Sequence, residues 1–501
     1  MADFDTTVPV VTDLVDGELV ETPTNDAMWL EDPNTGERLQ RMAVTSDDTL
    51  ERAIAAADRV HRDGSWSGLP PAERADWLER LADAVEARAA ESARLESLTT
   101  GVTIQMTGML SFITHAAFRL AATTLRSGWG TTVVDGDAGN PVEVLRLPWG
   151  PAVLLVPWNA PAPMAAHKAA SALAAGAPAI LKPSEFAPNG TGVIAAAAAD
   201  IGLPAGVLQL VHGGPHVGGR LVTDPRMRAV SFTGGLTGGR AIATACAPDF
   251  KPTQLELGGN NPVVVLDDAD LDDAARGVEM LMTQLNGQWC RALGRLVVHE
   301  SIVDDLLERV GARMSALRIG HSLDPSSAMG PMVHSGHLAG LRERIGELEA
   351  AGGTAHSWSS VPDLPGNFLA PTLVTGVASD DALHEIFGPV GTVHTFATDA
   401  EAVALANATP YGLEGYVFGG DEERAMGVAR QVRSGGVKVN GATVMSLALM
   451  APRPAWGLSG FADEGTVETI EFFCGTRVVG VEGMAPVAPP PSDQTTEGAP
   501  A

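Results

Sequence analysis

Positive charge and cysteine are scarce in this sequence, and each shortage excludes a class of protein. The 501 residues include 33 Lys and Arg against 61 Asp and Glu, so the net charge is −28. That charge repels phosphodiester backbones and anionic lipid headgroups, which argues against nucleic-acid and membrane partners. The three cysteines, at positions 246, 290 and 474, are too few and too scattered for a disulfide framework or a metal site.

Long apolar runs are absent as well. No segment approaches the ~18 consecutive apolar residues that a membrane span requires. The opening residues, Met-Ala-Asp-Phe-Asp, lack the basic and apolar regions of a signal peptide. Because 45% of the residues are hydrophobic and the chain is longer than one typical domain, a large core can be buried. These features predict a cytoplasmic enzyme of several domains.

Lysine is rarer here than any other charged residue. It occurs at four positions, which are Lys168, Lys182, Lys251 and Lys438. A chain that otherwise uses arginine is expected to keep lysine where a compact ammonium group is needed.

From about residue 140, short apolar runs alternate with alanine-rich helical stretches. "AVLLVPWNAP" leads into "MAAHKAASALAAG", and "APAILKPSE" leads into "GTGVIAAAAADIG". This alternation indicates an α/β fold with parallel sheets covered on both faces. It resumes after a break near residue 255, which indicates two such units. Segments 142–149 and 476–483 read as strands that lie outside the alternation.

Three further segments have distinct patterns. Residues 72–98 carry apolar positions at helical spacing, which predicts one or two amphipathic helices. The first ~20 residues show little periodicity, and we expect them to be loosely held. The proline-rich segment 485–501 is expected to be a disordered tail.

Two residues have neighbours that indicate chemistry. Cys290 ends the turn "NGQWC" and precedes Arg291, whose charge would lower the thiol pKa and favour a nucleophile, although a lone cysteine is more often a buried apolar residue. Glu256 in "QLELGGNNP" lies between leucines, which would raise its pKa and make it a base, although an exposed residue at a strand end is the simpler alternative.

Two other motifs favour a nucleotide. "SFTGGLTGGR" would present glycine amides and a helix N-terminus to a phosphate, but it does not match G-x-G-x-x-G and also fits a plain strand-to-helix turn. In "LKPSE", Lys182 and Glu185 follow a strand, where they suit the hydroxyls of a ribose; a surface ion pair is the alternative.

As an ordered set, these motifs resemble those of the aldehyde dehydrogenase superfamily, hydrolytic NAD(P)-dependent type, over about residues 25–483. The motifs are "PWNAP" (157–161), "KPSE" (182–185), "FTGGLTGGR" (232–240), "LELGGNNP" (255–262), "GQWC" (287–290), "EIFGP" (385–389), "NATPYGL" (407–413) and "SGGVKVNG" (434–441).

The resemblance implies a mixed α/β fold with three parts. A cofactor-binding domain would span 1–130 and 150–257, and a catalytic domain would span 258–460, each with a mainly parallel sheet. A small oligomerisation flap of strands would comprise 131–149 and 468–484. Its open edge would pair with another subunit and give a homodimer or homotetramer.

The resemblance also implies a reaction and its residues. Cys290 would attack an aldehyde, Asn159 and the Cys290 N–H would hold the oxyanion, and Glu256 would activate the hydrolytic water. Lys168 and Glu464 match a proton relay proposed for the family. NAD is the expected cofactor, with NADP possible. The residues expected to bind it are Pro157, Trp158, Lys182, Ser184, Glu185, Gly214, Phe232, Thr233, Gly234, Gly235, Gly239, Leu257, Glu385 and Phe387. CoA acylation and esterase or thioesterase activity are the alternatives.

The chain departs from the family where the substrate tunnel is expected. "PRPAWGLSG" (452–460) stands in place of the usual "PFGGxKxSG", so Arg453 replaces an aromatic residue. Three alternatives follow from these changes. Arg453 would bind the carboxylate of an acidic aldehyde, or the loss of aromatic rings would widen the tunnel for a bulky neutral aldehyde. In the third alternative, Arg291 and Arg453 would only brace loops. The residues expected to line the tunnel are Ala160, Met164, His167, Trp289, Arg291, Met445, Leu447 and Arg453.

Overall fold

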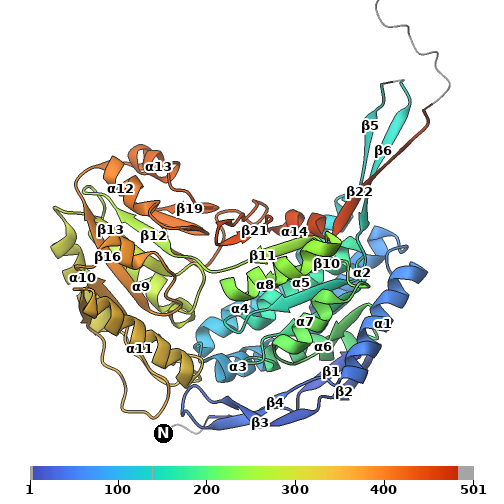
Figure 1. Cartoon of the computed structure of the whole chain (residues 1–501), viewed down its shortest axis with the longest axis horizontal. Helices are drawn as coiled ribbons and strands as arrows, with labels where there is room; N and C mark the ends of the chain where they lie inside the picture. Colours follow the sequence, from blue (N-terminus) through green and yellow to red (C-terminus); the bar gives the residue numbers. More distant parts are fainter. Residues whose placement is uncertain (1–3, 138, 483–501) are drawn as a thin grey trace, which may run out of the picture.

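The computed structural model describes residues 4–137 and 139–482. Two lobes, each built on its own β-sheet, lie side by side, and a narrow arm of three strands projects from one of them (Figure 1). The mixed α/β fold predicted from the alternation of strands and helices is confirmed. Within the described residues, no helix is both long enough and apolar enough to cross a membrane.

The first lobe contains an eight-stranded sheet. Its strands, in spatial order, are β2 (Glu18–Glu21), β1 (Thr12–Val15), β9 (Leu208–Leu210), β8 (Ala179–Pro183), β7 (Ala152–Val156), β10 (Ala229–Thr233), β11 (Thr253–Glu256) and β21 (Gly460–Phe461). The strands from β9 to β11 are parallel to one another. Successive side chains of β7 enter different apolar clusters, because Leu154 faces one side of the sheet and Val153 the other.

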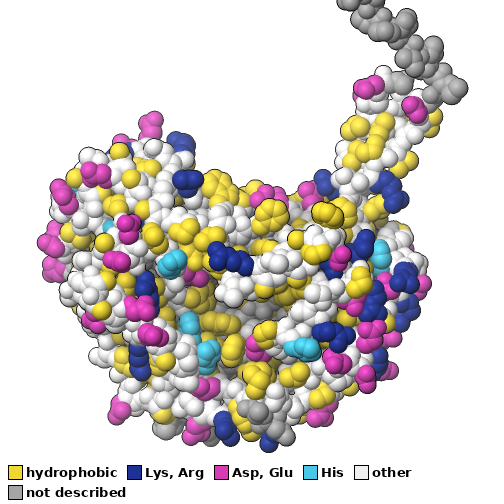
Figure 2. Space-filling model, in the orientation of Figure 1, with side chains coloured by type: hydrophobic (Ala, Val, Ile, Leu, Met, Phe, Trp, Pro, Cys, Tyr) yellow, Lys and Arg dark blue, Asp and Glu magenta, His cyan; other side chains and the backbone are white. Residues whose placement is uncertain are grey.

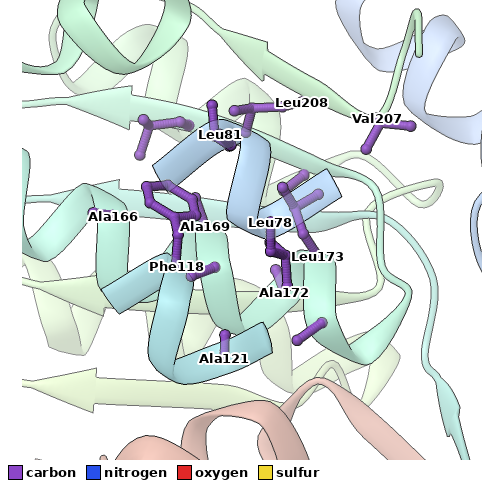
Figure 3. Close-up of a cluster of buried hydrophobic side chains, with 14 of the residues drawn as sticks. Leu78, Leu81, Phe118, Ala121, Ala166, Ala169, Ala172, Leu173, Val207 and Leu208 are labelled. Atoms are coloured by element: carbon purple, nitrogen blue, oxygen red, sulfur yellow. The ribbon is translucent and has the colours of Figure 1, made fainter. Parts of the chain in front are cut away.

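Helices cover both faces of this sheet. One face carries α5 (Pro161–Ala175) and α6 (Asn189–Asp200), with α2 (Pro71–Glu86), α3 (Ala89–Thr100) and α4 (Ile104–Arg126) packed behind them. The other face carries α1 (Asp47–Asp63), α7 (Pro215–Thr223) and α8 (Leu236–Cys246). Figure 3 shows the first of these interfaces, where Leu78 and Leu81 of α2 and Phe118 of α4 pack against Ala166, Ala169 and Leu173 of α5. The small alanine side chains of α5 let neighbouring helices approach closely.

The second lobe contains a seven-stranded sheet. Its strands, in spatial order, are β14 (Thr354–Ser357), β15 (Thr372–Thr375), β16 (Val390–Phe396), β13 (Leu293–His299), β12 (Asn261–Val265), β18 (Glu414–Phe418) and β19 (Gly436–Val439). All neighbours except β14 and β15 run parallel. Its helices are α9 (Leu271–Thr283), α10 (Val303–Ser315), α11 (Ser335–Ala350), α12 (Asp399–Ala406) and α13 (Glu422–Ala429). The chain then returns to the first lobe, because β21 pairs with β11.

The arm consists of β5 (Thr131–Asp135), β6 (Pro141–Pro148) and β22 (Cys474–Gly480), with β6 in the middle. The strands predicted at 142–149 and 476–483 are therefore present: β6 begins and ends one residue earlier than predicted, and β22 begins two and ends three residues earlier. α14 (Thr466–Phe472) packs on α5 before β22 begins. The remaining strands form two short pairs, β3 (Thr24–Glu31) with β4 (Arg38–Ala43), and β17 (Tyr411–Gly412) with β20 (Trp456–Gly457).

Two predictions about local structure have definite outcomes. The segment predicted to hold one or two helices contains two, α2 and α3. The prediction that the first ~20 residues are loosely held is wrong for β1, which pairs with β9 and buries Asp13 and Leu14. This strand is only four residues long, but it also forms an antiparallel hairpin with β2 across Asp16 and Gly17, so the Asp-Gly turn was an available sequence signal for it. The predicted disordered tail, 485–501, lies outside the described residues.

Candidate active site

A cavity of about 640 Å³ lies where the two lobes meet. Residues at the ends of β7, β8 and β10 form one wall, and Cys290, Glu385 and Phe387 come from the second lobe. The predicted cofactor residues on its wall are Pro157, Trp158, Lys182, Ser184, Glu185, Gly214, Phe232, Thr233, Gly234, Gly235, Leu257, Glu385 and Phe387. Asn159 and Cys290 line the same cavity, so the structure brings the predicted nucleophile and oxyanion donor to one space.

Gly239 is the one predicted cofactor residue that does not line this cavity within the described chain. It lies inside α8, and a Cβ there would be 2.6 Å from the Leu257 side chain. Glycine is therefore needed at this position because α8 packs closely against Leu257. The part of the predicted phosphate-binding turn that lines the cavity ends before Gly239.

The glycine turn encloses the ring of Phe232. A Cβ at Gly234 would lie 2.5 Å from that ring, and one at Gly238 would lie 2.9 Å from it. α8 begins directly after Gly235, which occupies its N-cap position. The Thr233 hydroxyl is buried and has no hydrogen-bond partner among the described residues. The turn thus offers an unused hydroxyl beside a helix N-terminus, which suits an anionic group.

The apolar far end of the cavity was not predicted. It is lined by α7 and α8 through Pro215, Gly218, Gly219, Val222, Gly238, Ala241, Ile242 and Ala245. The spacing of Ala241, Ile242 and Ala245 on one helical face is a signal that was present in the sequence.

Lys182 and Glu185 both reach this cavity. Lys182 is only 7% exposed, so the surface ion pair considered from the sequence is excluded. Its ammonium group donates to the Pro183 carbonyl at 2.9 Å, and burial lowers its pKa to about 8. Glu185 lies near Gly214, where a Cβ would be 3.6 Å from the carboxylate.

Glu385 is fixed by the loop that follows β11. Its Oε1 accepts a hydrogen bond from the Gly259 N–H at 2.8 Å, while burial raises the pKa of its carboxyl to about 7. A side chain at Gly258 would collide with the Glu385 carboxylate, and one at Gly259 would collide with the Cys290 carbonyl. These two glycines, which the sequence analysis did not assign to the site, let the loop approach both residues.

An aromatic group stands beside Glu385. The rings of Trp158 and Phe387 meet edge to face with centroids 5.4 Å apart. His337, at the start of α11, donates a 2.7 Å hydrogen bond from its Nε2 to the Phe387 carbonyl oxygen. Because that oxygen can only accept, Nε2 carries the proton. The pair Trp158 and Phe387 is therefore held in place at the wall of the cavity.

The turn that carries Cys290 has an unusual backbone. Leu285, Asn286 and Gly287 all have positive φ angles, of 48°, 57° and 72°. The Asn286 amide donates to the carbonyls of Gly101 and Pro331 at 2.7 and 3.0 Å, and its oxygen accepts from the Gly330 N–H at 2.8 Å. Asn286 therefore holds a left-handed turn just before the nucleophile. The sequence analysis missed it, although "NG" is a known signal for left-handed backbone.

The Cys290 thiol does not have the lowered pKa expected from its cationic neighbour. Burial raises the pKa of the thiol to about 12, and the lowering effect of Arg291 is smaller. Arg291 is itself half-buried and forms an ion pair with the buried Glu414. Because its charge is compensated there, Arg291 does little to stabilise a thiolate. Cys290 needs a base to lose its proton.

Glu256 is that candidate base, and it is the last residue of β11. The side chain is 4% exposed, so the alternative of an exposed residue is excluded. Burial raises the pKa of its carboxyl to about 8, as predicted from its leucine neighbours. Oε1 is buried and has no hydrogen-bond partner in the part of the chain that the structure describes. A free, buried carboxylate oxygen can take up a proton.

A buried polar cluster lies behind Glu256. The Lys168 ammonium group donates to the Ser231 hydroxyl at 2.7 Å, which donates to Gln254 at 2.8 Å. Lys168 also lies 3.7 Å from the Glu464 carboxylate, so the predicted pair is brought together. Burial acts to raise the pKa of Glu464, but the surrounding His167, Lys168 and Arg453 outweigh it and lower that pKa. Glu464 is thus held ionised.

Arg453 belongs to this cluster and not to the cavity wall. Its guanidinium group lies 3.6 Å from Glu464 Oε2, and the two residues also pair through their backbones. His167 lies 3.8 Å from the same carboxylate and 3.2 Å from the Thr469 hydroxyl. Arg453 and His167, two of the residues predicted for the substrate tunnel, therefore both lie beside the Glu464 carboxylate.

The eight predicted tunnel residues do not line the 640 Å³ cavity in the described structure. Ala160 and Trp289 pack in the apolar cluster of the second lobe next to Cys290, and Met164 packs in that of the first lobe. Met445 and Leu447 are 49% and 72% exposed. The apolar residues predicted for the tunnel therefore lie in the two apolar clusters or in an exposed loop, outside the cofactor-sized cavity.

All four lysines are buried, and each ammonium group has a partner. Lys251 donates to the carbonyls of Val222 and Asp224, and Lys438 donates to those of Thr443 and Met445. Their exposed fractions are 8% and 4%. The expectation that lysine is kept where an ammonium group is needed holds at every position.

Comparisons with known proteins agree with this geometry. The sequence profile of the Aldehyde dehydrogenase family matches residues 20–479. The succinate-semialdehyde dehydrogenase of Paenarthrobacter nicotinovorans is 34% identical over 88% of this chain and 98% of its own length. A putative aldehyde dehydrogenase from Burkholderia cenocepacia superposes with a TM-score of 0.90 at 35% identity, covering 95% of this chain and 99% of that one.

A second solved structure is the betaine aldehyde dehydrogenase of Staphylococcus aureus in complex with NAD⁺. It superposes with a TM-score of 0.90 at 29% identity, covering 95% of this chain and 96% of that one. With the ordered motifs, the two-lobed α/β fold and a cavity that joins Cys290 to the cofactor-type residues, the comparisons confirm the resemblance: the chain belongs to the aldehyde dehydrogenase family.

Proposed function

We propose that this enzyme oxidises an aldehyde to a carboxylic acid with NAD as the two-electron acceptor, through a thioester on Cys290. The observation that carries the proposal is that Asn159 and Cys290 share one cavity with Glu185 and Glu385. The overall reaction converts aldehyde, water and NAD⁺ to acid, NADH and a proton.

The cavity fits a dinucleotide. Its volume of about 640 Å³ is within the range of cofactor sites. Carboxylates at Glu185 and Glu385 can each accept hydrogen bonds from a ribose, and the glycine turn with Thr233 can hold the pyrophosphate. When bound, NAD supplies the redox chemistry that no side chain offers. The Glu185 charge repels a 2′-phosphate, so we expect kcat/KM to be higher with NAD than with NADP.

The two lobes supply different residues to this cavity, and we base a proposed division into domains on that difference. We propose that 1–130 and 150–257 form the cofactor-binding domain and 258–460 the catalytic domain, with 131–149 and 468–484 as the oligomerisation flap. The first sheet supplies Glu185 and the glycine turn, and the second lobe supplies Cys290 and Glu385.

Cys290 and Asn159 act on the aldehyde carbon and oxygen. The Cys290 sulfur bonds to the carbonyl carbon, and the oxygen becomes an oxyanion that accepts hydrogen bonds from the Asn159 amide and the Cys290 N–H. One Asn159 N–H already donates to the Gln288 carbonyl at 2.9 Å, which orients the amide and leaves its second N–H for the substrate.

Glu256 acts as the general base twice. It first takes the thiol proton, which the raised pKa of Cys290 makes necessary, and releases that proton to solvent. It then takes a proton from the water that hydrolyses the thioester. Its unpartnered Oε1 supports this role. A buried base that can activate water favours hydrolysis over transfer of the acyl group to CoA.

We further propose that the aldehyde is uncharged. Arg291 is paired with Glu414 and Arg453 with Glu464, so neither guanidinium is left to bind a substrate carboxylate. Cys290 packs against the apolar cluster of the second lobe, which contains Trp289 and against which Ala160 and Val444 also pack. The alternative in which both arginines brace the fold is thereby supported over an acidic substrate.

The test is to follow absorbance at 340 nm with a panel of neutral and carboxylated aldehydes, NAD, and CoA present or absent. We expect NADH formation without CoA and none with Cys290→Ala. Cys474→Ala, which changes a buried cysteine at the start of β22 that does not line the cavity, is the matched control and should retain activity. CoA-dependent turnover, or ester hydrolysis without any aldehyde oxidation, would overturn the proposal.

A further inference from the structure

Glu96 is a fully buried carboxylate that the mechanism above does not use. It lies on α3 and is 1% exposed. Its Oε1 accepts a hydrogen bond from the Ala162 N–H at 2.6 Å, while Oε2 is buried and unpartnered among the described residues. Burial raises the pKa of the Glu96 carboxyl to about 7. A group that is so costly to bury requires a reason.

The first turn of α5 contains a backbone N–H that needs an acceptor from outside the helix. Pro161 and Pro163 have no N–H, and the Met164 N–H donates to the Ala160 carbonyl at 3.3 Å. Ala160, at the N-cap, has a side chain that cannot accept a hydrogen bond. The Ala162 N–H is therefore the one donor of this turn that lacks a partner on its own helix, and Glu96 accepts it.

The slot for Glu96 is shaped by a neighbouring helix. A Cβ at Gly190, on α6, would lie 2.7 Å from Glu96 Cγ and 2.9 Å from Oε1. Three helices thus meet at this carboxylate: α3 carries it, α6 makes room for it, and α5 donates to it. The negative charge also faces the positive end of the α5 dipole.

The first turn of α5 determines the position of Asn159. Asn159 precedes Ala162 by three positions, and its amide donates to the Gln288 carbonyl in the turn that carries Cys290. The backbone at Ala160, between them, has φ −152° and ψ 63°, so the chain bends sharply from Asn159 into the helix. The position of the Asn159 amide relative to Cys290 therefore depends on where the first turn of α5 is held.

We propose that Glu96 is a positioning residue of the reaction, which anchors the first turn of α5 and thereby aims the Asn159 amide at the oxyanion formed on Cys290. This inference rests on the proposed function, because it requires that Asn159 donate to the oxyanion. It assigns Glu96 no contact with substrate or cofactor.

The test is a double-mutant cycle on Glu96→Ala and Asn159→Ala. We expect Glu96→Ala to lower kcat about tenfold or more, since misplacement of a catalytic group by about 1 Å costs up to ~100-fold. The KM for NAD should stay within about twofold. In the Asn159→Ala background, Glu96→Ala should cause no further loss. Cofactor-independent acylation of Cys290 by p-nitrophenyl acetate should follow the same pattern.

Companion variants separate positioning from folding. Glu96→Gln keeps an acceptor oxygen at the same reach and should restore most of kcat, whereas Glu96→Asp keeps the charge but is one methylene too short and should not. Glu91→Ala, on the exposed face of α3, is the matched control and should be fully active. If Glu96→Ala does not fold, Glu96→Asp takes its place in the cycle.

The inference is overturned by equal losses in both backgrounds, or by full activity of the folded Glu96→Ala enzyme. An inactive wild-type protein would overturn the proposed function instead. The two failures are therefore distinguishable.

Discussion

At the scale of single residues, three buried glutamates and the half-buried Glu385 illustrate how surroundings decide a role. Burial raises the pKa of Glu96 and Glu385 to about 7 and that of Glu256 to about 8. Glu464 is equally buried, yet neighbouring cations lower its pKa. The same side chain thus serves as helix anchor, candidate ribose acceptor, candidate base and fixed negative charge, because desolvation and local charge compete differently at each place.

The raised pKa of Glu256 predicts the pH dependence of turnover. A base works only when deprotonated, so kcat should rise with pH through about 8 and level off above it. Measuring kcat from about pH 6 to about pH 10 checks this. Glu256→Gln should remove the rise and accumulate acyl-enzyme, seen as at most a single burst of NADH. A profile for the wild type that is flat across this range would contradict the assignment.

The ion pair between Arg453 and Glu464 predicts the outcome of replacing Arg453. Arg453→Leu should leave the KM for carboxylated aldehydes within about twofold of wild type, because the guanidinium is engaged with Glu464. If Arg453 bound the substrate, loss of a charge-assisted contact would raise that KM about tenfold or more. Arg453→Lys, which keeps the charge, is the matched control for both readings.

At the scale of elements, the site depends on short irregular segments between regular ones. The turn from Leu285 to Gly287 delivers Cys290 between α9 and β13, and the loop through Gly258 and Gly259 passes between Glu385 and the Cys290 carbonyl. Parallel sheets place such loops together, because the carboxyl ends of neighbouring strands share one edge. The helices and strands provide a rigid frame, and the irregular segments set the contacts within it.

The left-handed turn before Cys290 predicts a separable effect of Asn286. Asn286→Ala removes three hydrogen bonds and places alanine, for which left-handed backbone costs ~1 kcal/mol or more, where asparagine tolerates it, so both kcat and the thermal midpoint should fall. Asn286→Gly removes the bonds but permits the backbone. We expect Gly to lose less stability than Ala, as measured by thermal unfolding; equal losses would show that backbone strain plays no part.

At the scale of the whole molecule, the arm has no role in the cavity but exposes apolar surface. Val133, Val134, Val478 and Val479 are between 45% and 68% exposed, and apolar side chains are visible along the arm (Figure 2). β5 and β22 are its two outer strands, each with one free edge in the described structure. Exposed valines beside open strand edges favour pairing with another copy of the chain.

We therefore predict a homodimer or homotetramer that assembles through the arm. Replacing Val133 and Val478 by Lys should place charges in the contact and shift the enzyme to monomers or disordered aggregates, measured by light scattering coupled to size exclusion. Val361→Lys changes a valine that is 49% exposed in the second lobe and should not alter the assembly. A wild-type protein that is a uniform monomer at micromolar concentration would refute the prediction.

Local sequence patterns were enough to predict the fold class and most of the candidate site residues. The apolar runs of β7 and β8, the glycine turn after β10 and the order of the motifs identified the α/β fold and the candidate residues, since each depends on neighbours a few positions away. The raised pKa of Glu256 also followed from adjacent leucines. Scarce lysine likewise indicated buried ammonium groups.

The tertiary structure alone decided what each charged side chain meets. From the sequence, Arg291 and Arg453 could either bind a substrate or brace loops, and in the folded chain they are paired with Glu414 and Glu464. Glu96 had no motif at all, because its partner lies 66 positions away on another helix. Electrostatic interactions and burial depend on distance in space, which sequence spacing does not encode, so the roles of buried charges become visible only once the chain is folded.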